Sequence, residues 1–144
     1  MSLQQNTTAS DNTAFGVRAL TTNTTGQENT VVGKSAAAAN TTGRSNVAMG
    51  YETFLNNTTG DFNTALGYEA LRANTTAENN TAVGKAALRV STTGANNVAV
   101  GSAAGEDMTT GSTSCFVGAS AGANATTGDS NTAVGQAAGF QITT

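Results

Sequence analysis

Small apolar and polar residues alternate along this chain in one pattern that repeats every seventeen residues. Each repeat reads approximately N-T-A-V-G-x-x-A-L-x-x-N-T-T-G-x-x. Its first apolar stretch ends in a glycine, with no insertion or deletion between copies: Gly16, Gly33, Gly50, Gly67, Gly84, Gly101, Gly118 and Gly135. Seventeen residues are too few for a helix-turn-helix repeat, and the β-branched Thr and Val favour strands. The pattern predicts an all-β fold, a parallel β-solenoid of eight coils, each with two short strands and two turns.

Alternation within the first strand predicts which side chains fill the coil. The residue before the glycine is Phe, Val, Met or Leu, and the residue two earlier is Thr, Val or Cys. Because side chains two apart share one face of a strand, we expect both columns to face the interior. The residue between them, usually Ala, would then face outward, where another chain can approach closely. On this interpretation Cys115 is a buried structural thiol.

The charged residues support a fixed cross-section. All fifteen occupy six of the seventeen columns: the two after the strand glycine, the fifth and sixth after it, and the two after T-T-G. A disordered tract would scatter its charges among all columns. We therefore expect a single repeat domain over residues 1–144, with the solenoid from about residue 6 to residue 144. The last repeat is incomplete, so we take the chain for a fragment of a longer protein.

Composition argues against several classes of function. The net charge is −3 and no segment is rich in Lys or Arg, which argues against nucleic-acid binding. No apolar run approaches membrane-spanning length, so we expect no membrane contact by this segment. The chain has no His, and a nucleophile at Cys115 would lack its usual imidazole partner. We expect no enzyme, no cofactor and no metal site, since the turn columns do not repeat the acidic ligand that a calcium β-roll needs.

Two sets of residues are candidates for surface contacts. The first lies in outer or turn columns and consists of Tyr51, Phe62, Tyr68, Glu52, Glu69 and Arg72. The second is a threonine ladder, one residue per coil: Thr25, Thr42, Thr59, Thr76, Thr93, Thr110 and Thr127. Alternation makes an asparagine its outward companion, as at Asn23 and Asn40. The simpler interpretation of the first set is a solvated surface, and that of the second set is a column in which threonine occurs because it favours β-structure.

A further asparagine column precedes the strand, from Asn12 through Asn29 and Asn46 to Asn131, with Ser114 as its one substitute. Asn at a repeated corner is typical of an amide ladder or of Asx turns. A coil that buries one Val-sized residue and one Leu gains little over the entropy of ordering its backbone. We therefore expect the chain to be stabilised by association with copies of itself.

The repeat resembles two groups of proteins. N-T-A-V-G, as at residues 80–84, resembles the S-V-A-I-G repeats in the heads of YadA-type trimeric autotransporter adhesins. With N-T-T-G, as at residues 57–60, it is similar to the N-T-A-V-G-x-x-A-L-x-x-N-T-T-G arrays of bacterial surface and phage tail-fibre-like proteins. The resemblance spans residues 6–144 and implies a left-handed β-roll, three chains around one axis and the Ala/Gly strand turned toward that axis. The adhesin heads have shorter coils, so the extra residues would lie in outer turns.

These observations favour a structural or adhesive module of a bacterial surface adhesin or phage fibre. It would be extracellular, at a cell surface or on a virion, a homotrimer with a host matrix protein or glycan as candidate partner. The alternatives are an ice-binding β-solenoid that uses the threonine ladder and a spacer that binds nothing. The sequence does not distinguish a trimer from a single-chain solenoid.

Overall fold

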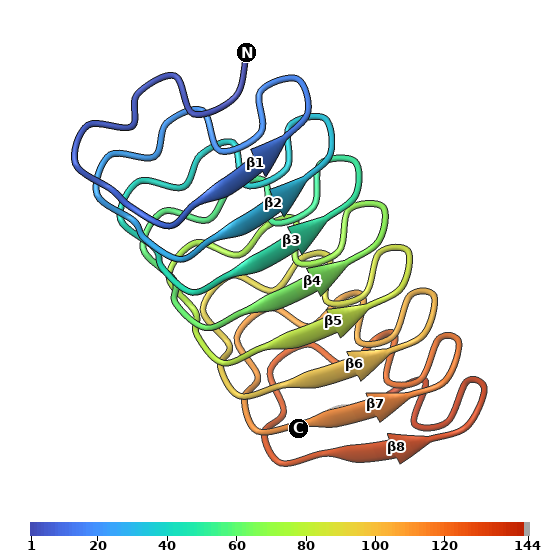
Figure 1. The fold of residues 1–144 in the computed structure, drawn as a ribbon. Helices are drawn as coiled ribbons and strands as arrows, with labels where there is room; N and C mark the ends of the chain where they lie inside the picture. Colours follow the sequence, from blue (N-terminus) through green and yellow to red (C-terminus); the bar gives the residue numbers. More distant parts are fainter. Residues whose placement is uncertain (143–144) are drawn as a thin grey trace.

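The computed structural model describes residues 1–142 and shows an all-β stack (Figure 1). One three-residue strand occurs per repeat in this part of the chain: β1 (Thr13–Phe15), β2 (Thr30–Val32), β3 (Val47–Met49), β4 (Thr64–Leu66), β5 (Thr81–Val83), β6 (Val98–Val100), β7 (Cys115–Val117) and β8 (Thr132–Val134). Each strand pairs in parallel with the next along the chain, and the order β1 to β8 has no crossover. The register offset is one repeat, so that Ala65 faces Ala82. The predicted parallel β-solenoid is confirmed.

The prediction of a second strand in each coil is wrong for residues 1–142. That half of the coil bends sharply, because residues such as Leu20, Leu71 and Leu88 have φ near +50°. Its backbone nevertheless bonds from coil to coil: the Leu71 N–H donates to the Ala87 carbonyl at 3.0 Å. Inter-coil hydrogen bonding therefore continues around the perimeter without a second regular sheet.

The strand is oriented opposite to our prediction. The middle residue of each strand faces the interior, and Ala48, Ala65 and Ala82 are completely buried. The flanking columns face outward, so that Met49 is 41% exposed and Val100 is 37% exposed. The physical reason is the narrow interior: where the wall opposite the strand contributes Leu or Phe, there is room only for alanine on the strand side.

Cys115 is therefore not the buried thiol that the sequence suggested. It begins β7, in the outward column, and is only half-buried. Its partners in register are Val98 and Thr132, which also face outward. The neighbouring Phe116, expected to face out, is completely buried.

Two walls line the core: the middle residue of each strand forms one, and the fourth residue after the strand glycine forms the opposite one. A large residue on one wall is accompanied by a small residue on the other. In four of the eight coils described the strand contributes Ala and the opposite wall contributes Leu or Phe, as in the pair Ala65 and Leu71. In β7 the strand contributes Phe116, and the opposite wall has Gly105 and Gly122 instead. A Cβ at Gly122 would lie 2.4 Å from the Phe116 ring, and one at Gly105 would lie 2.8 Å from it. These glycines therefore make room for the ring.

The asparagine column before the strand forms a buried amide ladder, one of the two arrangements expected. The Asn46 side-chain amide donates to the Gly60 carbonyl at 2.9 Å and to Asn29 Oδ1 at 3.1 Å. Its own Oδ1 accepts from the backbone N–H of Asn63 at 2.9 Å. Each buried asparagine thus satisfies main-chain groups that face the interior at a corner.

Replacing Asn46 with alanine is expected to lower the free energy of unfolding by about 2–4 kcal/mol, because the Gly60 carbonyl and Asn63 N–H lose their buried partner. Asn46→Ser is the matched control and should cost clearly less. The chain itself shows why: Ser114 occupies this column and accepts from the Asn131 N–H at 3.1 Å. Urea unfolding followed by circular dichroism measures both, and equal losses would contradict the role given to the ladder.

Candidate functional site

The outward side of the sheet forms one continuous surface, which we call the sheet face. It consists of the first and third residues of every strand, and none of these is charged. Most are apolar, and large ones are exposed at both ends, including Phe15 and Val134. Its members are Thr13, Phe15, Thr30, Val32, Val47, Met49, Thr64, Leu66, Thr81, Val83, Val98, Val100, Cys115, Val117, Thr132 and Val134.

Five of the six predicted contact residues come together beside the sheet face. The rings of Tyr51 and Tyr68 stack with centroids 5.3 Å apart. Arg72 binds the Glu52 carboxylate at 3.0 Å and lies 3.9 Å from that of Glu69. The sequence analysis missed Lys34, whose Nζ lies 5.6 Å from the Tyr51 ring centroid. Lys34 occupies the same column as the tyrosines one coil earlier, and this spacing could have identified it.

The charges of this cluster are mutually compensated. The hydrogen bond from Arg72, together with one from the Tyr51 hydroxyl, lowers the pKa of Glu52. The same bond to Glu52 and the charge of that carboxylate raise the pKa of Tyr51. The charge of Glu69 raises the pKa of Tyr68. Arg72, Glu52 and Glu69 are bound to one another across neighbouring coils, so these groups stabilise the stack.

Phe62, the sixth predicted contact residue, lies apart from the tyrosines. It is 53% exposed and occupies the corner before the strand, whereas the tyrosines follow the strand glycine. Its φ of +58° places it at a bend of the coil. The sheet face therefore lies between Phe62 and the two tyrosines.

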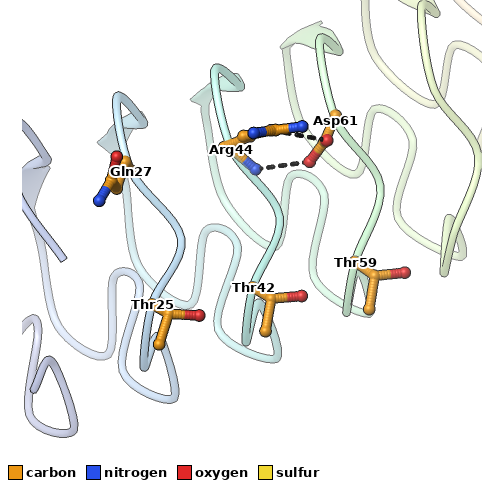
Figure 2. A pocket seen from close by; sticks show the side chains of 6 residues that line it. All are labelled: Thr25, Gln27, Thr42, Arg44, Thr59 and Asp61. Atoms are coloured by element: carbon orange, nitrogen blue, oxygen red, sulfur yellow. Dashed lines mark hydrogen bonds and ion pairs between the residues drawn. The ribbon is translucent and has the colours of Figure 1, made fainter. Parts of the chain in front are cut away.

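The threonine ladder lies on another side of the coil, and three of its members, Thr25, Thr42 and Thr59, line a shallow hollow of about 420 Å³. Figure 2 shows the side chains of Thr25, Thr42 and Thr59 in one row, all with the same orientation. Above them the Arg44 guanidinium binds Asp61 at 3.0 Å, and the Arg44 backbone N–H donates to the same carboxylate at 2.8 Å. All seven threonines of the ladder are exposed.

The asparagines do not accompany the ladder on the surface. Asn23, Asn40 and Asn57 are buried and bond to one another, with Asn40 Nδ2 donating to Asn23 Oδ1 at 2.9 Å. The expectation that they face outward is wrong, because the chain bends between them and the exposed threonine and is not extended there. The intervening Thr41 hydroxyl donates to the Thr58 carbonyl of the next coil at 2.9 Å. The ladder is thus a single exposed rank.

Comparison with models of known protein families, with curated proteins and with solved structures finds no match for this chain. The fold and its surfaces are therefore what a functional proposal can rest on. Across residues 1–142, no group of three or more His, Cys, Asp or Glu residues is placed to hold a metal ion. No helix in that range is long and apolar enough to cross a membrane.

Proposed function

We propose that this chain is a structural and adhesive module of a bacterial surface adhesin or phage fibre, acting outside the cell as a stiff homotrimeric rod. Three left-handed β-rolls would pack their sheet faces around one axis. One observation supports this most strongly: an uncharged, largely apolar strip runs along all eight described strands of a coil whose other sides carry the charges. Contiguous apolar surface of this extent marks an interaction site.

The packing energy supports the same proposal. The coil interior is mainly alanine, whose burial contributes less than that of larger side chains. Larger side chains, such as Leu66, Val83 and Val100, lie on the outside. Burying a Val or Leu side chain fully contributes about 1.5–3 kcal/mol. The sheet face thus holds much of the apolar stabilisation that the chain can gain, and it gains it on association.

Light scattering on a sizing column, with a dilution series, tests this proposal. We expect a mass of three chains for the natural sequence and a monomer after Leu66→Lys and Val83→Lys are combined, because two charges per chain then enter the apolar axis. Thr59→Lys with Thr76→Lys places the same charges on the threonine ladder and should leave the trimer intact. A folded monomer from the natural sequence would contradict the trimer.

Cys115 offers an independent measurement on the unaltered protein. It lies on the sheet face, so packing of three chains would cover it, whereas the isolated chain leaves it half-exposed. We expect its reaction with a small thiol reagent to be slowed at least about tenfold, relative to Leu66→Lys/Val83→Lys, since both proteins keep the same coil. Equal reaction rates would contradict burial of this face.

The exposed threonine ladder favours a second candidate, an ice-binding solenoid. Its threonines lie one per coil with one orientation, as Figure 2 shows for three of them. Thermal hysteresis that is lost in Thr59→Lys/Thr76→Lys would support it. If neither hysteresis nor binding to matrix proteins and glycans is found, the chain is a spacer whose role is to extend and stiffen.

A further inference from the structure

Two strips of residues border the sheet face, and we call them the entry rim and the exit rim. The entry rim is formed by the two residues before the buried asparagine column, and the exit rim by the two residues after the strand glycine. The entry rim comprises residues 10–11, 27–28, 44–45, 61–62, 78–79, 95–96, 112–113 and 129–130. The exit rim comprises residues 17–18, 34–35, 51–52, 68–69, 85–86, 102–103, 119–120 and 136–137.

On these rims, the charges that lack an ion-pair partner within residues 1–142 are separated by sign, and the one other such acid, Asp107, lies on neither rim. Half of the six basic residues, Arg44, Arg72 and Arg89, form ion pairs inside the chain. The other three, Arg18, Lys34 and Lys85, are exposed and all lie on the exit rim. The entry rim carries exposed acids without an ion pair in the described structure: Asp11, Glu28, Glu78 and Asp129.

In three coils the opposite charges also match. Asp11 and Arg18 border β1, Glu28 and Lys34 border β2, and Glu78 and Lys85 border β5. The partners are six or seven residues apart on opposite sides of an extended strand. At about 3.3 Å per residue, the strand holds them too far apart to bind within one chain. A second copy of the chain can bring them together.

We propose that the entry rim of one copy binds the exit rim of the next at the same height, so that the copies are parallel and in register. This inference rests on the homo-oligomer proposed above. An antiparallel arrangement would place two entry rims together, acid against acid. A slip of one coil places Glu78 opposite Glu69 in one direction and opposite the uncharged Ser102 in the other. A slip of three coils would also place acids opposite the three bases, but one of them, Asp61, is already bound to Arg44, and only five of the eight described coils would overlap. The parallel, in-register arrangement pairs all three bases with acids that have no ion pair within residues 1–142. Where it brings Asp61 toward Glu69, each acid lies beside an arginine of its own chain.

Charge reversal tests this pairing. Lys34→Glu with Lys85→Glu makes both rims acidic, and Glu28→Lys with Glu78→Lys makes both basic at those coils. Since an exposed ion pair changes an equilibrium constant by about two- to five-fold, each double variant should dissociate at a concentration on the order of 10–100-fold higher. The difference should shrink in concentrated salt, which screens exposed charges.

The quadruple variant, which combines the four substitutions, is the matched control. It keeps the net charge of the natural chain and restores opposite charges between its own rims. We expect its dissociation to return to that of the natural chain. When the natural and quadruple chains carry different tags and are refolded together, they should assemble separately, because every mixed interface brings like charges together at β2 and β5 and keeps only the Asp11 and Arg18 pair at β1.

Two outcomes would overturn the rim pairing. If the natural chain is oligomeric but mixes freely with the quadruple variant, the rim pairing is wrong and the oligomer stands. If the natural chain is a monomer at every concentration, the rim pairing and the proposed trimer are both wrong. Circular dichroism of each variant establishes that the solenoid is folded before the masses are compared.

Discussion

Replacing Phe116 with alanine is expected to lower the free energy of unfolding by about 3–5 kcal/mol, the usual cost of removing a buried phenylalanine ring. The ring is completely buried and occupies the space that side chains at Gly105 and Gly122 would need. Neither glycine has a side chain that could move into the cavity. Urea unfolding of the variant beside the natural chain measures the loss.

The chain itself suggests how to restore that stability. Adding Gly122→Leu to Phe116→Ala gives this coil the Ala and Leu combination found at Ala65 and Leu71. The backbone tolerates leucine there, because Leu71 has φ +49° and Gly122 has φ +61°. We expect the double variant to recover more than half of the loss, whereas Gly122→Leu alone should destabilise, since its side chain would overlap the ring. If the losses in unfolding free energy from the two single substitutions simply add in the double variant, the side chains at residues 116 and 122 do not compete for the same space.

Replacing Gly84 with alanine is expected to cost more than about 3 kcal/mol, because strain and overlap combine. Its φ is +136°, a conformation that side chains strongly disfavour. A Cβ at this position would lie 2.4 Å from the Gly101 carbonyl oxygen of the next coil. Neither group can move without breaking the inter-coil hydrogen bonds on both sides. Thermal and urea unfolding of the purified variant measure the effect.

Gly135→Ala is the matched control. Gly135 also has a positive φ, +122°, but its Cβ would meet nothing closer than Ala138 Cβ at 3.9 Å. It should show only the strain, about 1–3 kcal/mol. A loss as large as that of Gly84→Ala would mean that backbone strain alone, and not contact between successive coils, explains the glycine column.

The period and the segregation of charges were sufficient to predict the parallel solenoid. They did not predict which side of the strand faces in, because alternation defines two faces without saying which one is buried. The usual rule that larger apolar residues are inside fails here, since the coil is too narrow for Val or Leu on both walls. One signal in the sequence could have identified the inner column. The middle residue of the strand changes from Ala99 to the much larger Phe116 in adjacent coils, and the opposite wall there has Gly105 and Gly122 where four other coils have Leu or Phe.

The positions of the surface aromatic residues followed from the sequence in part. Column position correctly placed Tyr51 and Tyr68 at the surface, and their equal spacing from the strand glycine explains why they stack. Phe62 is separated from them because it lies before the strand. The rims were not recognised from the sequence. Residues six or seven apart border the same outward face only if the first and third residues of the strand point outward, and the sequence analysis had placed these residues inside.

The hydrogen bonds between coils lie along the rod, and this determines how the rod would respond to force. Tension along the axis would pass through every coil in series, but the coil at each end would detach first, because it has only one neighbour to hold it. A released coil of seventeen residues extends to about 60 Å, compared with the roughly 4.8 Å it occupies in the stack. A tether built from such coils would lengthen in steps under load while the remaining coils stay folded.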